Sequence, residues 1–322
     1  MLSLIDRIRT IIYHRTHKQM VKTALIGAGY WGSKLQNTLE KIPNCSVEQV
    51  LDIKQNQSIE DLNQDIEAVV IATPAWEHYQ DVIKSLAKNL HVYVEKPMCI
   101  THQEAQDIVS KCTDKKFMVG HIFLYNDCVR KIKKVIDVSK IKYIEIERQN
   151  WGRYQYKISP VQSFAPHDFA ILDYWLGDFE LNNVAVKGNM ITQTAQPDHI
   201  DAWFKCNHIN VSMRYSWACP SKIRIIRIHE ENKVIEYNDV EHRFTITDPT
   251  MHEGRFNYGA HISDITISNH EPLEEEMKHF FECIVEDKPV LSDQHNGLKI
   301  TKFTDELDRA LIESMRQETP NP

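Results

Sequence analysis

The chain has 322 residues, of which 42% are hydrophobic, and its 38 basic and 45 acidic residues leave a net charge of −7. This length suits two domains, each with its own core. The acidic balance argues against a general nucleic-acid-binding protein, because such proteins depend on clustered Lys and Arg. No run of about 20 apolar residues is present, so we expect no membrane-spanning helix.

The seven cysteines are scattered along the chain and include no C-x-x-C pair. This pattern favours a reducing, cytoplasmic compartment over a disulfide framework. The sixteen histidines show none of the spacings typical of metal ligands. We therefore predict no metal site.

Residues 1–19 combine apolar residues at roughly helical spacing with four basic residues and a single acid, Asp6. This pattern predicts a basic amphipathic helix. Such a helix could lie on an anionic membrane surface, or it could pack against its own domain or a neighbouring subunit, which we favour. Charges interrupt the apolar run and no small-residue cleavage site follows, which argues against a signal peptide.

The stretch from Val21 to Gly32 reads VKTALIGAGYWG, an apolar run of strand type that leads into spaced glycines. A G-x-G-x-x-G pattern between a strand and a helix is the dinucleotide-binding fingerprint. Gly27 would permit the tight turn, Gly29 would let the backbone approach a pyrophosphate, and Gly32 would let helix and strand pack closely. The first amides of the following helix would then face the phosphates.

A second predicted strand, Val47 to Leu51, ends in Asp52, about 20 residues beyond the glycines. An acid at that distance is expected to hold a ribose hydroxyl and to repel the extra phosphate of NADP, so Asp52 favours NAD. A solvated carboxylate at a strand end is the alternative. Only 15 residues separate Asp52 from the next buried strand, Ala68 to Ala72, which predicts a shortened crossover.

Short apolar strands then alternate with helical patterns up to about residue 121. We expect a helix from His78 to about Lys88 with a left-handed C-cap at Asn89, and a capping box formed by Thr101 and Glu104. The alternation predicts a doubly wound parallel sheet, a Rossmann domain over residues 20–121. The expected strands after residue 72 are His91 to Val94 and Phe117 to Gly120.

Residues 122–322 change to alternating strands with few intervening helices. This predicts a second α+β domain with a large, mostly antiparallel, open sheet. If helices cover one face, the other is expected to be buried by a partner subunit, giving a homo-oligomer. The acidic residues Glu274 to Glu276 are expected to complement the N-terminus of a helix. The expected strands are 141–148, 181–190, 202–204, 210–217, 223–229, 234–237 and 243–247, with helices from 272 and over 295–316.

In an open parallel sheet, ligands bind beyond the carboxyl ends of the strands. Lys96 lies at such an end, within Glu95-Lys96-Pro97. A partly buried ammonium beside a cationic nicotinamide would have a lowered pKa and could relay a proton to or from a hydroxyl; an ordinary surface lysine is the alternative. The Lys96–Pro97 bond could be cis, which would fix the direction of the amine.

The order GAGYWG, Asp52, ATP-x-x-x-H, EKP and an α/β second domain resembles the Gfo/Idh/MocA oxidoreductases over nearly the whole chain after residue 20. Two further stretches, GHIFLY at 120–125 and APHDFAI at 165–171, resemble a branch associated with nucleotide-sugar oxidation, typified by UDP-N-acetylglucosamine 3-dehydrogenases. The resemblance implies that Lys96 and His167 flank the substrate carbon. Lys96 would relay the proton, His167 would act as acid/base or orienting group, and a hydride would pass to nicotinamide C4.

Members of that family usually carry an Asp four residues before the active-site histidine, whereas this chain has Ser163. A hydroxyl supports the charged imidazole more weakly than a carboxylate does, and the adjacent Asp168 is a candidate to substitute in part. A helix start after Pro166 is the structural alternative for His167. Arg153 and Tyr154 could contact the diphosphate or the sugar of a substrate. A packed loop without a ligand contact is an equally open interpretation of these two residues.

We assign two sets of site residues from the motifs and the resemblance together. The predicted cofactor site contains Gly27, Gly29, Tyr30, Trp31, Gly32, Asp52, Thr73, Pro74, His78, Glu95 and Lys96. The predicted substrate site contains His121, Tyr125, Arg153, Tyr154, Ser163, His167 and Asp168. The expected function is NAD-dependent oxidation or reduction of a sugar, with a nucleotide sugar of surface-polysaccharide synthesis as the substrate. A catalytically impaired NAD-binding sensor or assembly subunit, and an inositol or free-sugar dehydrogenase, are the alternatives.

Overall fold

The computed structural model describes residues 20–55, 57–152, 154–192, 194, 196–252, 255–259 and 271–318. The predicted helix over residues 1–19 and the candidate site residue Arg153 lie outside the described residues. Contacts divide the chain into two compact units. The parallel-sheet unit contains residues 20–99, 106–120 and 271–297, and the mixed-sheet unit contains 100–105, 121–259 and 298–318.

The two units interleave along the chain, whereas we expected a continuous boundary at residue 121. Residues 271–297 belong to the parallel-sheet unit because α7 (Pro272–Val285) is tied to its strands. Phe280 of this helix packs edge-on against Tyr93, with ring centroids 5.9 Å apart. A helical pattern near the C-terminus carries no signal of which sheet it will cover, so the sequence could not assign it.

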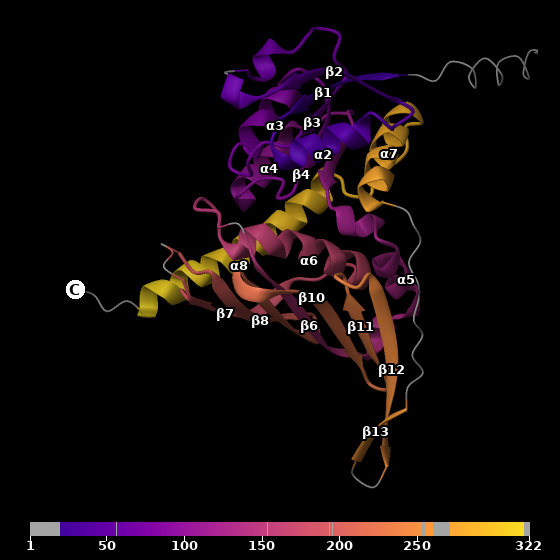
Figure 1. The fold of residues 1–322 in the computed structure, drawn as a ribbon, viewed down its shortest axis with the longest axis vertical. Coiled ribbons are helices and arrows are strands. Elements are labelled where there is room, and N and C mark those ends of the chain that lie inside the picture. Colours follow the sequence, from indigo (N-terminus) through magenta and orange to yellow (C-terminus); the bar gives the residue numbers. More distant parts are fainter. Residues whose placement is uncertain are drawn as a thin grey trace, which may run out of the picture. The chain divides into compact units, whose positions relative to one another are not determined.

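Five strands form the sheet of the first unit, and every neighbouring pair is parallel. This confirms the predicted parallel sheet. β3 has no exposed residue, as expected for a parallel strand covered on both faces. The strands are β1 (Val21–Ile26), β2 (Cys45–Leu51), β3 (Ala68–Ile71), β4 (His91–Glu95) and β5 (Phe117–Gly120), in the order β2-β1-β3-β4-β5 (Figure 1).

The helices of this sheet begin and end close to the predicted positions. α2 (Tyr30–Leu39) directly follows the glycine turn, where a helix was expected. α3 (His78–Ala87) is followed by Asn89 at φ 56°, which confirms the left-handed residue after the helix. Before α4 (His102–Lys111), Thr101 and Glu104 exchange side-chain-to-backbone hydrogen bonds of 3.0 and 3.2 Å, the predicted capping box.

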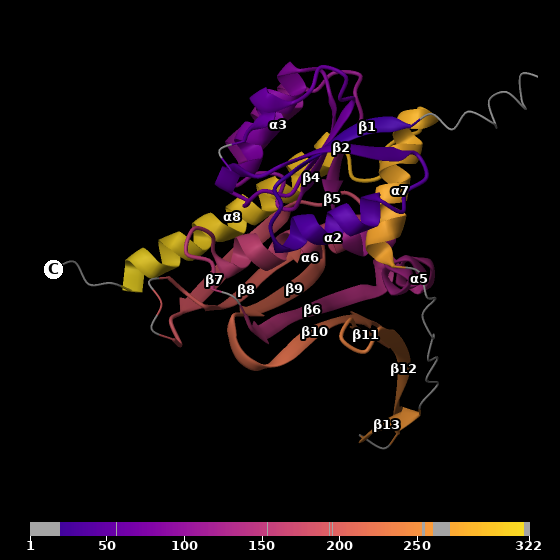
Figure 2. The same ribbon diagram turned by 45° about the horizontal axis from the view of Figure 1, so that its top comes forward.

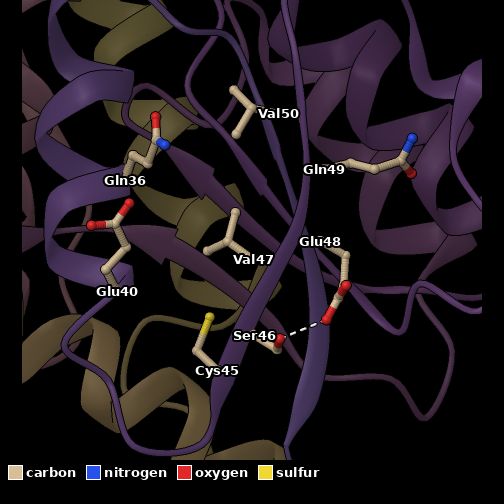
Figure 3. Close-up of a pocket in the computed structure, with 8 residues that line it drawn as sticks. All are labelled: Gln36, Glu40, Cys45, Ser46, Val47, Glu48, Gln49 and Val50. Atoms are coloured by element: carbon tan, nitrogen blue, oxygen red, sulfur yellow. Dashed lines mark hydrogen bonds between the residues drawn. The ribbon is translucent and has the colours of Figure 1, made fainter.

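The crossover from β2 to β3 is shortened, as predicted. Its described residues form no helix beyond the 3-10 turns η1 (Ile53–Gln55) and η2 (Ile59–Asp61). β2 is an edge strand of the sheet. A shallow hollow runs beside this strand, lined by Gln36, Glu40 and residues 45–50 (Figure 3). The hollow follows the strand rather than its carboxyl end, and therefore does not coincide with the predicted site.

Eight strands form the sheet of the second unit. Neighbouring strands are antiparallel except β6 and β9, which are parallel. This confirms the predicted large, mostly antiparallel sheet, although β13 was not predicted. The strands are β6 (Ile141–Trp151), β7 (Leu181–Asn189), β8 (His199–Cys206), β9 (Ile209–Ser216), β10 (Ala218–Glu230), β11 (Val234–Asn238), β12 (Arg243–His252) and β13 (Arg255–Gly259), in the order β13-β12-β11-β10-β6-β9-β8-β7 (Figure 2).

One face of this sheet is covered by helix. α6 (Pro160–Leu176) packs on β8 and β9, next to α5 (Asp127–Val135) (Figure 2). α8 (Gln294–Glu318) begins in the first unit and continues in the second. The strands alternate buried and more exposed residues, and Trp203 on the uncovered face is 48% exposed. Among the described helices none is long and apolar enough to cross a bilayer.

A buried ion pair ties α6 to the sheet. Arg148 of β6 donates from Nε to Oδ1 of Asp168 at 2.7 Å, and both side chains are almost fully buried. Tyr215 donates to the other carboxylate oxygen at 3.0 Å. Burial raises the pKa of Asp168, and the charge of Arg148 opposes that rise. A buried pair of this kind is costly to break because one charge is left without a partner.

Replacing Arg148 with Met should lower the free energy of unfolding by about 3–5 kcal/mol, since Asp168 would stay buried and lose its cation. Arg214→Met is the matched control, because Arg214 makes the same 2.7 Å contact to Asp201 but is half exposed. That loss should not exceed about 1 kcal/mol. Chemical denaturation of both variants measures the two values. Equal losses would contradict the importance of the buried pair.

Candidate active site

The N-terminus of α2 is open to an anion. Gly29 is its N-cap, and no side chain in the described part of the chain caps the helix there. A Cβ built on Gly29 would meet no atom of the described residues within 4 Å, so there is free space above the turn. The first amides of a helix lack partners within the helix and attract negative charge. The turn therefore fits the pyrophosphate of a dinucleotide.

The other two glycines are required by close packing. Gly27 has φ 101°, and a Cβ there would lie 2.8 Å from the backbone of Ala72 and Thr73. A Cβ on Gly32 would lie 1.9 Å from the carbonyl oxygen of Gly27. The turn is thus pressed against the end of β3, in agreement with the roles predicted for these two positions.

Asp52 lies beside the turn at the carboxyl end of β2. Ile26 and Leu51 are paired across β1 and β2, and Gly27 donates its N–H to the Leu51 carbonyl at 2.8 Å. The half-buried Asp52 accepts a hydrogen bond from the N–H of Lys54 at 3.0 Å. Its carboxylate is therefore held by its own turn, next to the glycines, as the sequence predicted.

His78 lies between two backbone carbonyls, and its contact with the cofactor remains a prediction. Its ring is 1% exposed, and its nitrogens lie 2.8 Å from the Thr73 carbonyl and 2.7 Å from the Pro97 carbonyl. Burial lowers the pKa of His78, while the two carbonyls favour its charged form. Both ring nitrogens are occupied, so His78 joins the end of β3 to the loop after β4. Thr73 itself donates to Asp81 at 2.7 Å, and Pro74 is exposed beside it.

Glu95 links the glycine turn to Lys96. Trp31 donates from Nε1 to Glu95 at 2.5 Å, and the N–H of Lys96 donates to the same carboxylate at 3.2 Å. Burial raises the pKa of Glu95, and the Trp31 hydrogen bond and then the Lys96 charge oppose that rise. The Lys96–Pro97 bond is cis and Lys96 is half buried. Tyr30, in contrast, is 74% exposed beneath the ammonium group of Lys34.

His167 lies within α6 and not at a helix start. The helix begins at Pro160, where Ser159 caps it by accepting the N–H of Gln162 at 3.2 Å. His167 is the one residue of 160–172, all of which are described, that is not buried. Ser163 is four residues earlier and therefore on the same face of the helix. It accepts a hydrogen bond from Gln155 at 3.4 Å.

Phe123 and Asp168 are two residues near His167 whose own contacts indicate what each of them does. The Phe123 ring lies edge-on to the His167 ring, with centroids 5.0 Å apart. Asp168 uses both carboxylate oxygens on Arg148 and Tyr215. It therefore holds the helix in place, and nothing in its contacts supports the substituting role that we considered for it.

Two further candidates lie deep in the mixed-sheet unit. His121 is 1% exposed and directly precedes η3 (Ile122–Tyr125), and Tyr125 is 4% exposed at the end of η3. This 3-10 turn packs on α6. Tyr154 packs edge-on against Trp217, with ring centroids 5.8 Å apart. Phe164 of α6 also contacts Trp217, with ring centroids 6.4 Å apart. Tyr154 is thus part of an aromatic cluster next to α6.

Sequence reasoning missed several residues that build these sites. Arg148 continues the inward-facing series Ile144 and Ile146 along β6, so its burial was readable from the two-residue period. Glu276 is fully buried, although we expected it to complement a helix end.

No group of three potential metal ligands occurs among the described side chains.

The predicted cofactor residues all belong to the parallel-sheet unit, and the described members of the predicted substrate set all belong to the mixed-sheet unit. Lys96 is in the first group and His167 in the second. In the parallel-sheet unit, hydrogen bonds link Trp31, Glu95 and Lys96. In the mixed-sheet unit, η3 packs on α6, the helix that carries His167. The pairing of Lys96 with His167 remains a prediction.

Known proteins with similar sequences support a dinucleotide-binding Rossmann unit in the first part of the chain. Residues 21–123 match the model of the Gfo/Idh/MocA oxidoreductase family, described as an NAD-binding Rossmann fold. The 2,7-anhydro-N-acetylneuraminate hydratase of Mediterraneibacter gnavus is 30% identical, but the match spans only 42% of this chain and 41% of that protein. The UDP-N-acetylglucosamine 3-dehydrogenase of Acidithiobacillus ferrooxidans is 20% identical over 87% of this chain and 94% of its own length.

Solved structures share the fold over most of the chain. The structure of the same Acidithiobacillus ferrooxidans dehydrogenase has a TM-score of 0.78 at 18% identity, covering 91% of this chain and 98% of that chain. A levoglucosan dehydrogenase in complex with NADH and L-sorbose has a TM-score of 0.75 at 17% identity, covering 94% and 98%. At these identities the likeness establishes the fold. Residues 21–123 match the NAD-binding Rossmann fold of the Gfo/Idh/MocA oxidoreductase family.

Proposed function

We propose that this protein is an NAD-dependent oxidoreductase that transfers a hydride between nicotinamide and a secondary alcohol or ketone of a sugar. The observation that carries the proposal is the junction of the glycine turn and the Lys96 loop, made by the 2.5 Å hydrogen bond from Trp31 to Glu95. This junction fixes a potential proton donor and acceptor at the same sheet edge as the phosphate-binding turn.

The cofactor preference follows from Asp52. Its carboxylate lies next to the turn, where a ribose hydroxyl can donate to it and the additional phosphate of NADP would be repelled. The amides of α2 and the space above Gly29 would receive the pyrophosphate. When bound, the nicotinamide ring supplies or accepts the hydride.

The chain's own residues would manage the proton. Lys96 would take the proton of the sugar hydroxyl during oxidation and return it during reduction, at its Nζ. His167, presented by an otherwise buried helix segment, would orient the hydroxyl or share the proton. Ser163, one helical turn earlier, stands where the resembling family usually carries an Asp.

We further propose that the sugar is nucleotide-activated, of the UDP-N-acetylhexosamine type oxidised at C3, in surface-polysaccharide biosynthesis. The support is the match to a UDP-N-acetylglucosamine 3-dehydrogenase, which spans 87% of this chain. The aromatic cluster of Tyr154, Trp217 and Phe164 could stack against a base or a sugar ring. A homo-oligomer through the uncovered sheet face and a cytoplasmic location complete this proposal.

Two alternatives have specific support. Ser163 and the shortened crossover favour a cofactor-binding sensor or assembly subunit without turnover. A Bacillus subtilis scyllo-inositol 2-dehydrogenase is 24% identical over 45% of this chain, which keeps an inositol or free-sugar substrate open. A screen of UDP- and dTDP-sugars, inositols and free sugars, read at the reduced-nicotinamide absorbance band, separates the three.

Lys96→Ala should lower kcat by about 10²–10⁴-fold, the usual contribution of general acid–base catalysis. NAD affinity, measured by calorimetry, should change little. Lys88→Ala, at an exposed position after α3, is the control. Full turnover by the Lys96 variant with NAD bound would exclude the proposed proton relay.

Asp52→Asn should weaken NAD binding by about tenfold or more, the loss expected when one hydrogen bond to a charged group is removed. The preference for NAD over NADP should narrow at the same time, because the repelling charge is gone. Glu48→Gln removes an exposed carboxylate from the same strand and serves as control. An unchanged ratio of the two dissociation constants would show that Asp52 does not select the cofactor.

Ser163→Asp should move the acidic limb of the pH–rate profile to higher pH. The physical reason is that a carboxylate one turn from His167 favours the protonated imidazole. Ser163→Asn adds similar bulk without charge and should leave that limb in place. The proposed role of His167 would be refuted by identical profiles for the two variants.

A further inference from the structure

Three oxygen-bearing side chains form a buried chain in the parallel-sheet unit. The hydroxyl of Tyr93 lies 3.1 Å from Oε1 of Glu95 and 3.0 Å from Oε2 of Glu276. Tyr93 and Glu276 are fully buried, and Glu95 is 8% exposed. These hydrogen bonds therefore connect α7 to Glu95, the residue immediately before Lys96.

The number of protons in this chain is constrained by geometry. A phenol has one proton and can donate to only one of two carboxylates. With both carboxylates ionised, the second contact would bring lone pairs together and place two negative charges around one buried hydroxyl. Such an arrangement is strongly disfavoured where water is excluded. One of the two carboxyl groups must therefore carry a proton.

The hydrogen-bond partners identify which carboxyl group it is. Glu95 also accepts from Trp31 at 2.5 Å and from the N–H of Lys96 at 3.2 Å, which stabilises its anion. Glu276 has Tyr93 alone, and its Oε1 is buried without a hydrogen-bond partner in the described part of the chain. Burial and the Glu95 charge hold the pKa of Glu276 well above its usual range.

We infer that Glu276 is a neutral carboxylic acid that donates to Tyr93, so that Tyr93 donates to Glu95 and fixes its carboxylate beside Lys96. Tyr93 and Glu276 are thus positioning residues that act through Glu95. The proton on Glu276 is independent of the proposed function. The expected effect on turnover does rest on the proposed function, because it depends on the proton-relay role of Lys96.

The space around the Tyr93 hydroxyl is closely packed. A Cβ on Gly120 of β5 would lie 2.4 Å from the Tyr93 hydroxyl and 3.2 Å from Oε1 of Glu95. Phe280 packs on the Tyr93 ring, so the phenol cannot move aside easily. The glycine at position 120 therefore fits a hydroxyl held between two carboxyl groups.

The proton is tested without substrate, using Glu276→Gln. The titratable groups that act on Glu276 are Glu95 and Tyr93, and the charge of Lys96 acts on Glu95. An acid whose pKa is raised by folding loses stability as the pH rises above its unfolded value, near 4.5. Glutamine does not titrate, so the Tm of the variant should rise relative to wild type between about pH 5 and 8. Glu274→Gln, on the exposed side of α7, controls for the loss of one carboxylate.

Infrared spectroscopy gives the second readout. The C=O band of a protonated carboxylic acid should be present in the wild type at pH 7 and missing from Glu276→Gln. A Tm difference that does not change with pH, together with no such band, would overturn the inference. Both measurements remain decisive if no sugar is turned over, so failure of the proposed function and failure of this inference can be told apart.

The positioning role is tested by turnover. Tyr93→Phe should lower kcat by about tenfold, the loss expected when one hydrogen bond to a charged group is removed. It should also shift the pH–rate profile, while the KM for NAD stays nearly constant. Glu276→Leu should behave in the same way, and Glu276→Gln should restore most of the lost rate because its amide can still donate. Equal rates for the Leu and Gln variants, or a Tyr93→Phe profile identical to wild type, would contradict the positioning role.

Discussion

The close approach of the glycine turn to the end of β3 is the constraint on which the nucleotide end of the molecule depends. There is no room for a methyl group between Gly32 and the Gly27 carbonyl, or between Gly27 and the backbone of Ala72. This packing sets the first turn of α2 at the carboxyl edge of the sheet, next to Asp52. Because no side chain of the described residues caps that turn, its amides suit the phosphate-binding role that we propose.

The loop that carries Lys96 is held from two sides. Trp31 reaches Glu95 from the glycine turn, and His78 reaches the Pro97 carbonyl from the start of α3. The inferred proton on Glu276 adds a third attachment, through Tyr93. Three segments of the same unit therefore converge on one short loop, which is the kind of pre-organisation that a proton-transferring side chain requires.

Much of the parallel-sheet unit was predictable because its signals are local. The glycine spacing, the left-handed Asn89, the Thr101 capping box and the short crossover each depend on a few neighbouring residues. The start of α6 also had a local signal, Ser159 before Pro160, which the nearby Pro166 obscured. Burial of Glu276 had none, because the acidic run containing it suits an exposed helix end equally well, and only tertiary packing distinguishes the two environments. The same applies to the placement of α7 on the first sheet.

The central claim is direct hydride transfer between a sugar carbon and nicotinamide, managed by Lys96. The most direct measurement uses UDP-N-acetylglucosamine deuterated at C3, incubated with the protein and NAD, followed by mass spectrometry of the cofactor. The account predicts that deuterium appears in the reduced nicotinamide and that turnover slows relative to the unlabelled sugar. Reduced cofactor without deuterium, or a cofactor that binds but is never reduced by this or any other nucleotide sugar, would contradict it.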